Sequence, residues 1–244
     1  MAVPAQLSYS SGTSDVPLLG DTIGENLDRT VATFPDREAM VDCASGRRWT
    51  YREFADDVNV VALGLAARGI GKGDRVGIWS PNRAEWTLVQ YATAKLGAIL
   101  VNINPAYRVH ELTYVLNQAG IKMLISAQSF KTSDYAAMIG EARPDCPKLT
   151  DVVLFDSQDW DDLLATGKAG DPSTLDQIKL SADDPINIQY TSGTTGFPKG
   201  ATLSHHNILN NGFFVGELCS YTEQDRICIP VPFYHCFGMV MGNL

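Results

Sequence analysis

The stretch that decides most about this chain is residues 190–200, which read Tyr190-Thr191-Ser192-Gly193-Thr194-Thr195-Gly196-Phe197-Pro198-Lys199-Gly200. It follows an apolar, strand-like run at 185–189. The glycines let backbone N–H groups turn toward one point, the hydroxyls add donors, and Lys199 adds a positive charge at the far end. This composition predicts a loop that binds a polyanion, with a nucleoside triphosphate the best fit. A surface turn without a ligand is the alternative, although such a turn needs far fewer of these residues.

Spacing excludes two better-known loops. A Walker A loop has a glycine, four residues, and then Gly-Lys-Ser/Thr. Counting from Gly193 places Pro198 and Gly200 at the second glycine and hydroxyl positions. A hydrolase nucleophile elbow has the pattern Gly-x-Ser-x-Gly. Around Ser192 the first glycine position holds Tyr190, so Ser192 is a poor candidate for a nucleophile.

On both sides of this stretch, apolar periodicity and turn residues predict helices that alternate with short strands. Helices are expected at 23–34, 51–65, 82–97, 110–118, 135–141 and 205–218, with Thr50, Asn82 and Ser204 as N-caps. Strands are expected at 39–43 and 48–50, as a hairpin, and at 75–79, 98–103, 122–126, 152–155, 185–189, 200–203 and 226–231. Residues 156–183 are expected to form a surface connection with one short helical piece around 160–164. Such alternation predicts an α/β fold whose mostly parallel sheet carries helices on both faces.

The composition limits the classes of molecule that this chain is expected to bind. The chain has 244 residues, a net charge of −9 and no run of Lys or Arg, which argues against nucleic acid and against electrostatic binding to anionic lipid. ATP is not excluded, because it requires only local positive potential. No stretch reaches the length of a transmembrane segment. Residues 1–19 are rich in Ser, Pro and Gly and contain no Lys or Arg, which predicts a flexible tail rather than a secretory signal.

The five cysteines are scattered, and they form no C-x-x-C pair. An odd number without such spacing predicts reduced thiols in a cytoplasmic protein. Peripheral contact with a membrane and oligomerisation are both left open. Cys228, His235 and Cys236 lie close in the sequence but lack the fourth ligand and the spacing of a zinc site, so no zinc is expected there.

The loop and its surroundings resemble the phosphate-binding signature of the adenylate-forming (AMP-binding) enzymes. Four further segments support the resemblance: Thr50-Tyr51-Arg52-Glu53-Phe54, Gly73-Asp74-Arg75-Val76, Ala201-Thr202-Leu203-Ser204-His205-His206-Asn207 and Pro232-Phe233-Tyr234-His235-Cys236-Phe237-Gly238-Met239. The likeness therefore runs from about residue 20 to the end. Within the superfamily, the sequence of these segments is most similar to that of bacterial medium- and long-chain fatty acyl-CoA synthetases.

The resemblance implies ATP-dependent activation of a fatty acid to an acyl-adenylate and then, with coenzyme A, to acyl-CoA. It implies that the β- and γ-phosphates of ATP are bound by Thr191, Ser192, Gly193, Thr194, Thr195, Gly196 and Lys199. It also places Mg²⁺ at Thr191 and His235 beside the α-phosphate and the acyl carboxylate, with Phe237, Gly238 and Met239 near the acyl channel. The alternative for His235 is a histidine satisfied within an aromatic core.

Members of the resembling family are much longer than this chain. We therefore expect 20–244 to be the N-terminal part of the AMP-binding domain, without the small C-terminal domain and its catalytic lysine. We also expect that residues 1–244 alone do not complete acyl-CoA formation. Two further hypotheses remain: a non-catalytic module that binds nucleotide or acyl groups, and an aryl-CoA ligase of the same superfamily.

Overall fold

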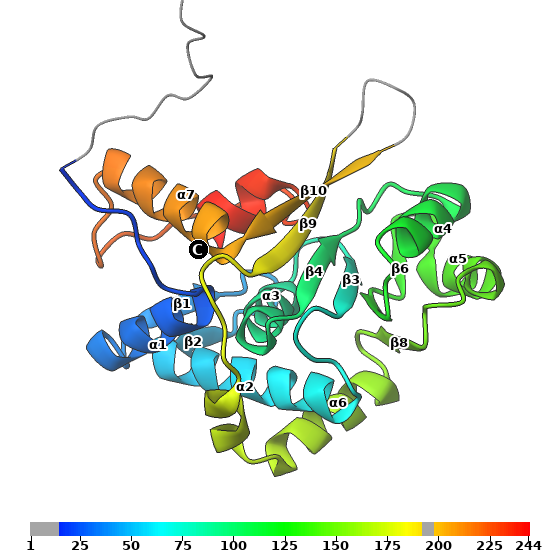
Figure 1. Cartoon of the computed structure of the whole chain (residues 1–244), viewed down its shortest axis with the longest axis horizontal. Helices are drawn as coiled ribbons and strands as arrows, with labels where there is room; N and C mark the ends of the chain where they lie inside the picture. The colour runs from blue at the N-terminus through cyan, green and yellow to red at the C-terminus, as the bar shows by residue number, and fades with distance from the viewer. Residues whose placement is uncertain (1–14, 192–197) are drawn as a thin grey trace, which may run out of the picture.

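The protein was analysed as a computed structural model, which describes residues 15–191 and 198–244. Within these residues the main sheet has six strands in the order β10-β9-β4-β3-β5-β8 (Figure 1). The strands are β3 (Arg75–Trp79), β4 (Ile99–Asn102), β5 (Met123–Ser126), β8 (Asp151–Leu154), β9 (Pro185–Thr191) and β10 (Lys199–Ser204). All neighbours pair in parallel except β9 and β10, which are antiparallel. The predicted mostly parallel sheet is confirmed.

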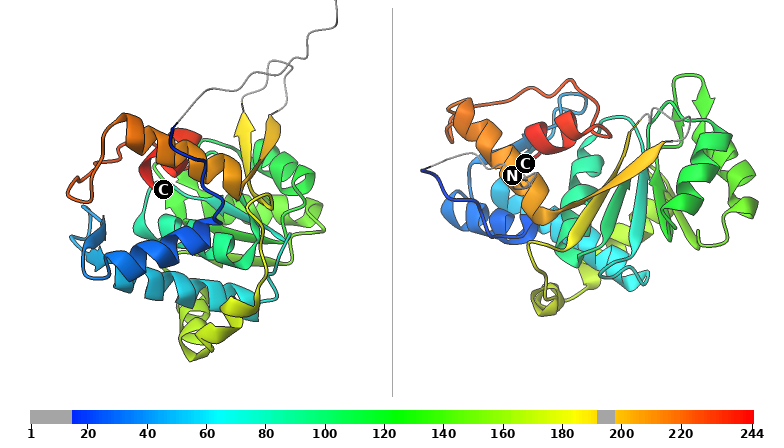
Figure 2. Two further views of the ribbon diagram at one scale, coloured as in Figure 1. Left: turned by 60° about the vertical axis from the view of Figure 1, so that its left-hand side comes forward. Right: turned by 45° about the horizontal axis from the view of Figure 1, so that its top comes forward.

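Helices cover both faces of this sheet, as Figure 2 shows. One face carries α1 (Ile23–Thr33), α2 (Tyr51–Ala67), α3 (Ala84–Leu96), α6 (Gln158–Ala169) and α7 (His205–Leu218), and the other carries α4 (Val109–Gln118) and α5 (Tyr135–Ala142). Successive side chains along a strand point to opposite faces of the sheet, so the core consists of two clusters, one on each face. Val76 and Ile78 of β3 enter the first cluster, while Trp79 enters the second.

Caps predicted from the sequence set the starts of two helices. At α2, the Thr50 hydroxyl accepts from Glu53 N at 3.2 Å and the Glu53 carboxylate accepts from Thr50 N at 2.8 Å. This capping box satisfies two of the backbone donors that a helix start leaves open. Ser204 caps α7 in the same manner, with Asn207 as its partner. Both helices begin where the sequence places them.

Two expectations about local structure are wrong. The N-cap of α3 is Arg83, not Asn82, because the Asn82 side chain bonds instead to the backbone of Val231 and Phe233. The expected strand at 226–231 does not form. That segment is held through side chains, with Arg226 bound to Glu38, rather than through a strand ladder.

The expected surface connection at 156–183 is largely a structural layer. Its helix α6 has 12 residues, not a short piece, and its side chains Trp160 and Leu163 are buried. Glycines allow α6 to pack closely on α2. A Cβ built on Gly167 would lie 1.9 Å from the Val60 carbonyl oxygen, and one built on Gly64 would lie 2.5 Å from that of Leu163. Only residues without side chains permit this approach.

Smaller elements complete the fold. The predicted hairpin forms from β1 (Glu38–Val41) and β2 (Arg48–Thr50). The sequence did not predict the short pair β6 (Ser129–Phe130) and β7 (Ser133–Asp134), the 3-10 turns η1 (Arg143–Asp145) and η2 (Pro172–Gln177), or the π-helical turn η3 (Phe237–Gly242). Among the residues described, no helix combines the length and apolarity needed to cross a membrane.

A buried histidine joins the first helix to the last long one. His205, at the start of α7, is 0% exposed, and its Nδ1 accepts from Ile23 N at 3.2 Å. Its Nε2 has no hydrogen-bond partner within the described part of the chain. Burial lowers the pKa of His205 to about 4, although Asp184 and Glu25 act to raise it and Lys72 acts to lower it. The imidazole is therefore neutral near pH 7.

Candidate functional site

The candidate site lies at the carboxyl ends of the parallel strands. β3 pairs with β4 on one side and with β5 on the other, and the intervening helices α3 and α4 cover opposite faces. In open α/β sheets, ligands bind outside the carboxyl ends of the strands, at the place where neighbouring strands lead into helices on opposite faces of the sheet. The loop singled out in the sequence leaves the sheet at this edge, from the end of β9.

Two side chains mark the base of that loop. Thr191 ends β9, Lys199 begins β10, and the two residues are paired across the antiparallel ladder. The Thr191 hydroxyl donates to the Lys199 carbonyl at 3.4 Å, and both residues are exposed. The remaining predicted phosphate ligands, Ser192, Gly193, Thr194, Thr195 and Gly196, lie outside the described residues. The site thus presents a hydroxyl and a cation side by side at the mouth of the loop.

His235 lies on an exposed turn just before η3, not within an aromatic core. Its Nδ1 accepts from Phe237 N at 3.2 Å, and Tyr234 meets the ring edge-on with the ring centroids 6.4 Å apart. A neutral imidazole that accepts at Nδ1 carries its proton on Nε2. The local backbone therefore makes Nε2 the donor of this side chain.

Carboxamides tie this turn to the strand ends. Gln189 Nε2 donates to the Tyr234 carbonyl at 2.7 Å, and Asn102 Nδ2 donates to the same oxygen at 3.3 Å. Asn82, in the segment after β3, donates to the Val231 carbonyl at 2.8 Å and accepts from Phe233 N at 2.8 Å. These roles were not predicted from the sequence. The available signal was a carboxamide near the carboxyl end of each of the three strands.

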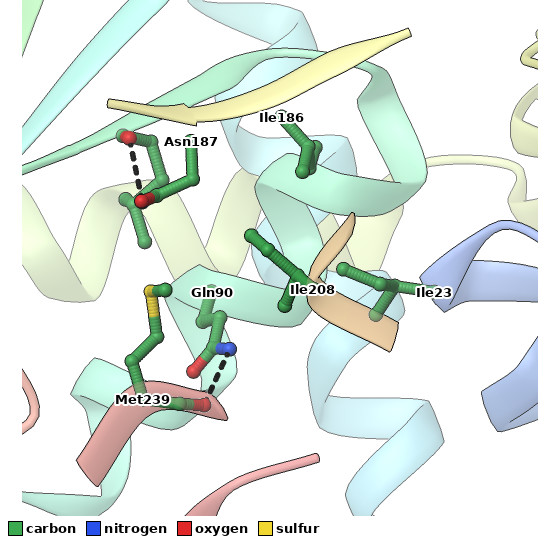
Figure 3. Close-up of a pocket in the computed structure, with 7 residues that line it drawn as sticks. Ile23, Gln90, Ile186, Asn187, Ile208 and Met239 are labelled. Atoms are coloured by element: carbon green, nitrogen blue, oxygen red, sulfur yellow. Dashed lines mark hydrogen bonds between the residues drawn. The ribbon is translucent and has the colours of Figure 1, made fainter. Parts of the chain in front are cut away.

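Two further amides, Asn187 and Gln90, lie around a small cavity beside Met239 (Figure 3). Asn187 donates to the Leu100 carbonyl at 2.9 Å and to Asn102 Oδ1 at 3.0 Å. Gln90 donates to the Met239 carbonyl at 3.1 Å. These side chains line a cavity of about 10 Å³ with Ile23, Leu100, Ile186, Ile208 and Met239. Asn187 Oδ1 has no hydrogen-bond partner in the described residues.

The residues expected near the acyl channel have different environments. Phe237 is 46% exposed, whereas Met239 is 1% exposed and its sulfur lies 3.1 Å from Asn102 Nδ2. Gly238 is required by the turn, because a Cβ there would lie 2.6 Å from the Pro232 carbonyl oxygen. Phe237 therefore faces outward, and Met239 forms part of the packed floor below His235.

Phenols approach the loop base from the α4 side. Tyr114 of α4 donates to the Pro198 carbonyl at 3.3 Å, close to the end of the loop. Burial, together with the neighbouring Tyr114 and Tyr107, raises the pKa of Tyr190 to about 12. The Tyr190 phenol therefore remains protonated near pH 7 and acts as a neutral hydrogen-bonding group. Neither Tyr190 nor Tyr114 was predicted to have this place from the sequence.

Metal-binding chemistry is limited at this edge. Within residues 15–191 and 198–244, no group of three or more His, Cys, Asp or Glu side chains could hold a metal ion. Mg²⁺ commonly takes one or two protein ligands and several oxygens from substrate phosphates and water. The exposed Thr191 hydroxyl fits that limited role, whereas the described residues offer no cage for a resident ion.

Comparisons with known proteins agree with this architecture. A family model described as AMP-binding enzyme matches residues 27–244. The medium-chain acyl-CoA ligase ACSF2, mitochondrial, is 44% identical in Danio rerio and 41% identical in Mus musculus, over 97% and 98% of this chain. The inhibitor-bound N-terminal domain of FACL13 from Mycobacterium tuberculosis matches 91% of this chain and 54% of its own, with a TM-score of 0.75 and 28% identity. This chain spans 43% of the length of each ACSF2 relative.

Proposed function

The chain belongs to the AMP-binding enzyme family, and from that premise we propose that it supplies the ATP-binding site of a fatty acid–CoA ligase. A fatty acid carboxylate oxygen attacks the α-phosphorus of ATP, and pyrophosphate leaves with the bonding electrons. The thiolate sulfur of coenzyme A, formed by loss of the thiol proton to water, then attacks the acyl carbonyl of the adenylate, and AMP leaves with the electrons of the broken C–O bond. The first of these steps is the one to which the residues described above can contribute.

One observation carries the proposal: the phosphate loop and His235 converge on one strand. Gln189 donates to the Tyr234 carbonyl at 2.7 Å. Gln189 lies just before Thr191, where the loop begins, and Tyr234 directly precedes His235. Segments far apart in the sequence thus meet at the edge of the sheet where α/β proteins bind nucleotides. A loop without a ligand gives no reason for this convergence.

Each side chain has a distinct role in the proposed step. Lys199 binds a phosphate oxygen and, with Thr191 and the loop, aligns the departing pyrophosphate. The Nε2–H of His235 donates to the oxygens that gain charge around the α-phosphorus. Preorganised donors of this kind stabilise a transition state more than a ground state. Mg²⁺, held near Thr191 by the ATP phosphates, would neutralise phosphate charge.

The relatives guide the choice of substrate. The ACSF2 proteins are named as medium-chain acyl-CoA ligases, so a medium-chain fatty acid is the first substrate to test. Phe237 and Gly238 are proposed beside the acyl group, and Met239 supports the floor. Location is a separate proposal: reduced cysteines favour the cytoplasm, whereas the ACSF2 relatives are named as mitochondrial.

The decisive experiment is ATP/pyrophosphate exchange in the product of the complete reading frame. Fatty acids of increasing length and several aryl acids would be supplied in turn. Exchange that depends on fatty acids supports the proposal and defines the chain length. Exchange only with aryl acids identifies an aryl-CoA ligase. Binding of ATP without any exchange identifies a non-catalytic module.

A further inference from the structure

The backbone just before His235 is held by side chains from three strand ends. Asn82 forms two bonds, one to the Val231 carbonyl and one from Phe233 N, each 2.8 Å long. Asn102 and Gln189 both donate to the Tyr234 carbonyl, at 3.3 and 2.7 Å. The Tyr234 carbonyl belongs to the same planar peptide unit as the N–H of His235. These bonds therefore fix the plane from which the histidine side chain projects.

Two of the three carboxamides are themselves held in place. Asn102 is 1% exposed and Gln189 is 7% exposed. The Asn102 amide donates to Gln189 Oε1 at 3.1 Å, and its own oxygen accepts from Asn187 at 3.0 Å. Amide groups linked on both sides cannot rotate without losing buried hydrogen bonds, and a buried polar group left without a partner is unfavourable. The support behind Tyr234 is rigid.

The opposite side of the turn is equally restricted. Gly238 passes so close to Pro232 that a Cβ would lie 2.6 Å from the Pro232 carbonyl oxygen. The His235 ring then closes on its own turn through the bond from Phe237 N to Nδ1. The bonds from Asn82, Asn102 and Gln189 to this turn all end on the backbone of residues 231–234, directly before His235. Bonds that meet on one short backbone segment restrict the position of the side chain that follows it.

We propose that Asn82, Asn102 and Gln189 are positioning residues that fix the His235 imidazole, with Nε2–H as its outward donor, for the adenylation step. The catalytic part of this inference rests on the proposed function, whereas the fixed orientation does not. A carboxamide suits the task because it donates and accepts without carrying charge. None of the three is assigned contact with ATP or the fatty acid.

The test compares Asn82→Ala with Asn117→Ala. Asn82 is exposed, so its truncation leaves the core intact. Asn117 is a matched control, because its amide also donates to a backbone carbonyl, that of Asp145 at 2.9 Å, but away from this edge on α4. Asn82→Ala is expected to lower kcat for ATP/pyrophosphate exchange about 10- to 100-fold with KM for ATP within about threefold of wild type. Asn117→Ala should change neither constant.

A second readout needs no activity. The ¹⁵N chemical shifts of the four histidine rings, with His235→Gln to identify the relevant signals, report which ring nitrogen carries the proton. In wild type, His235 should show the Nε2–H form; in Asn82→Ala its shifts should move toward an average of the two tautomers. Gln189→Met should have the same effect through the buried side. Unchanged His235 shifts in both variants would overturn the inference. Absence of exchange in wild type would instead refute the proposed function, and the ring shifts would still decide the positioning.

Discussion

Lys199 stands at the start of the outermost strand of the sheet, exposed and beside Thr191. Replacing it with Ala should leave the fold intact, because exposed substitutions usually change stability by less than about 0.5 kcal/mol. It should lower kcat/KM for ATP about 10- to 100-fold, since a hydrogen bond to a charged group contributes about 1.5–3 kcal/mol. The measurement is ATP/pyrophosphate exchange at varied ATP concentration, in the product of the complete reading frame.

The control for Lys199 is Lys168→Ala. Lys168 is also exposed but lies in the last turn of α6, so removal of its charge changes the net charge equally without touching the loop. Loss of activity in both variants would indicate a general electrostatic effect. Exchange that is unaltered in Lys199→Ala would exclude Lys199 as a phosphate ligand.

His235→Ala should slow adenylation more than it weakens ATP binding. The proposed donor acts on charge that develops in the transition state, so its loss appears in kcat. We expect a fall of about 100-fold in exchange rate and a change of less than about threefold in the dissociation constant of ATP, measured by calorimetry. His110→Ala, at an exposed position on α4, serves as the control. A rate equal to wild type would remove His235 from the mechanism.

The candidate site was only partly predictable from residues read locally. The loop and His235 carry a motif, so the sequence alone was enough to propose them. The roles of Asn102 and Gln189 depend on contacts with Tyr234 across 132 and 45 residues, and no local pattern specifies such pairs. Asn82 shows how a distant contact can override a local preference. Asn is a favourable N-cap, but this side chain bonds instead to the backbone of Val231 and Phe233.

At the scale of elements, the crossing of α2 and α6 makes a sharp prediction. Gly167→Ala should destabilise the protein by more than about 3 kcal/mol, because its Cβ would lie 1.9 Å from the Val60 carbonyl oxygen and the helices would have to separate. Gly140→Ala is the matched control on α5, where nothing lies within 4 Å of the added carbon. That change should stabilise by about 0.5–1 kcal/mol through helix propensity. Urea unfolding followed by circular dichroism measures both, and equal midpoints would contradict the crossing.

Elements with strong local signals were predictable, and those fixed by tertiary contacts were not. Thr50 with Glu53, and Ser204 with Asn207, place helix starts through bonds within one turn. The helical piece expected at 160–164 already contained the buried side chains Trp160 and Leu163, and the extent of α6 was underestimated because its other residues are mostly polar. The apolar run at 226–231 has strand propensity, but the alternating pattern does not say whether a sheet edge lies beside it.

At the scale of the whole molecule, His205 should make stability depend on pH. Burial lowers its pKa to about 4 in the folded chain, whereas an unfolded histidine titrates near 6.5. The unfolded state therefore binds the extra proton first, so stability is complete above about pH 6.5 and falls as the pH drops toward 4. Between about pH 7 and about pH 5 the free energy of unfolding should decrease by about 2 kcal/mol from this group.

The matched experiment replaces His205 with Asn, whose oxygen can still accept from Ile23 N. Urea unfolding at the two pH values should show a smaller difference in His205→Asn than in wild type. His110→Asn, at an exposed position, should retain the wild-type difference. An equal pH dependence in all three proteins would show that His205 does not titrate as its burial requires.

The fold class was predictable from the sequence, but the order of the strands in the sheet was not. Alternating helices and strands gave the mostly parallel sheet with two covered faces, because that is the way such elements bury their apolar sides. The strand order β10-β9-β4-β3-β5-β8 depends on which neighbour each crossover reaches. The short strands Ile99–Asn102 and Met123–Ser126 are both buried throughout, so burial pattern alone does not distinguish their places.

The bond from Ile23 N to His205 also has a consequence for biosynthesis. Its two residues are 182 positions apart, and the bonds between Leu19 and Asn210 span 191. Translation at roughly 5–20 residues per second separates their emergence by roughly 10–40 seconds. During that interval the backbone N–H of Ile23, in the first helix, has not yet met its acceptor, His205 Nδ1. The helix at 23–33 therefore remains without this contact for that period, in which chaperones can bind it.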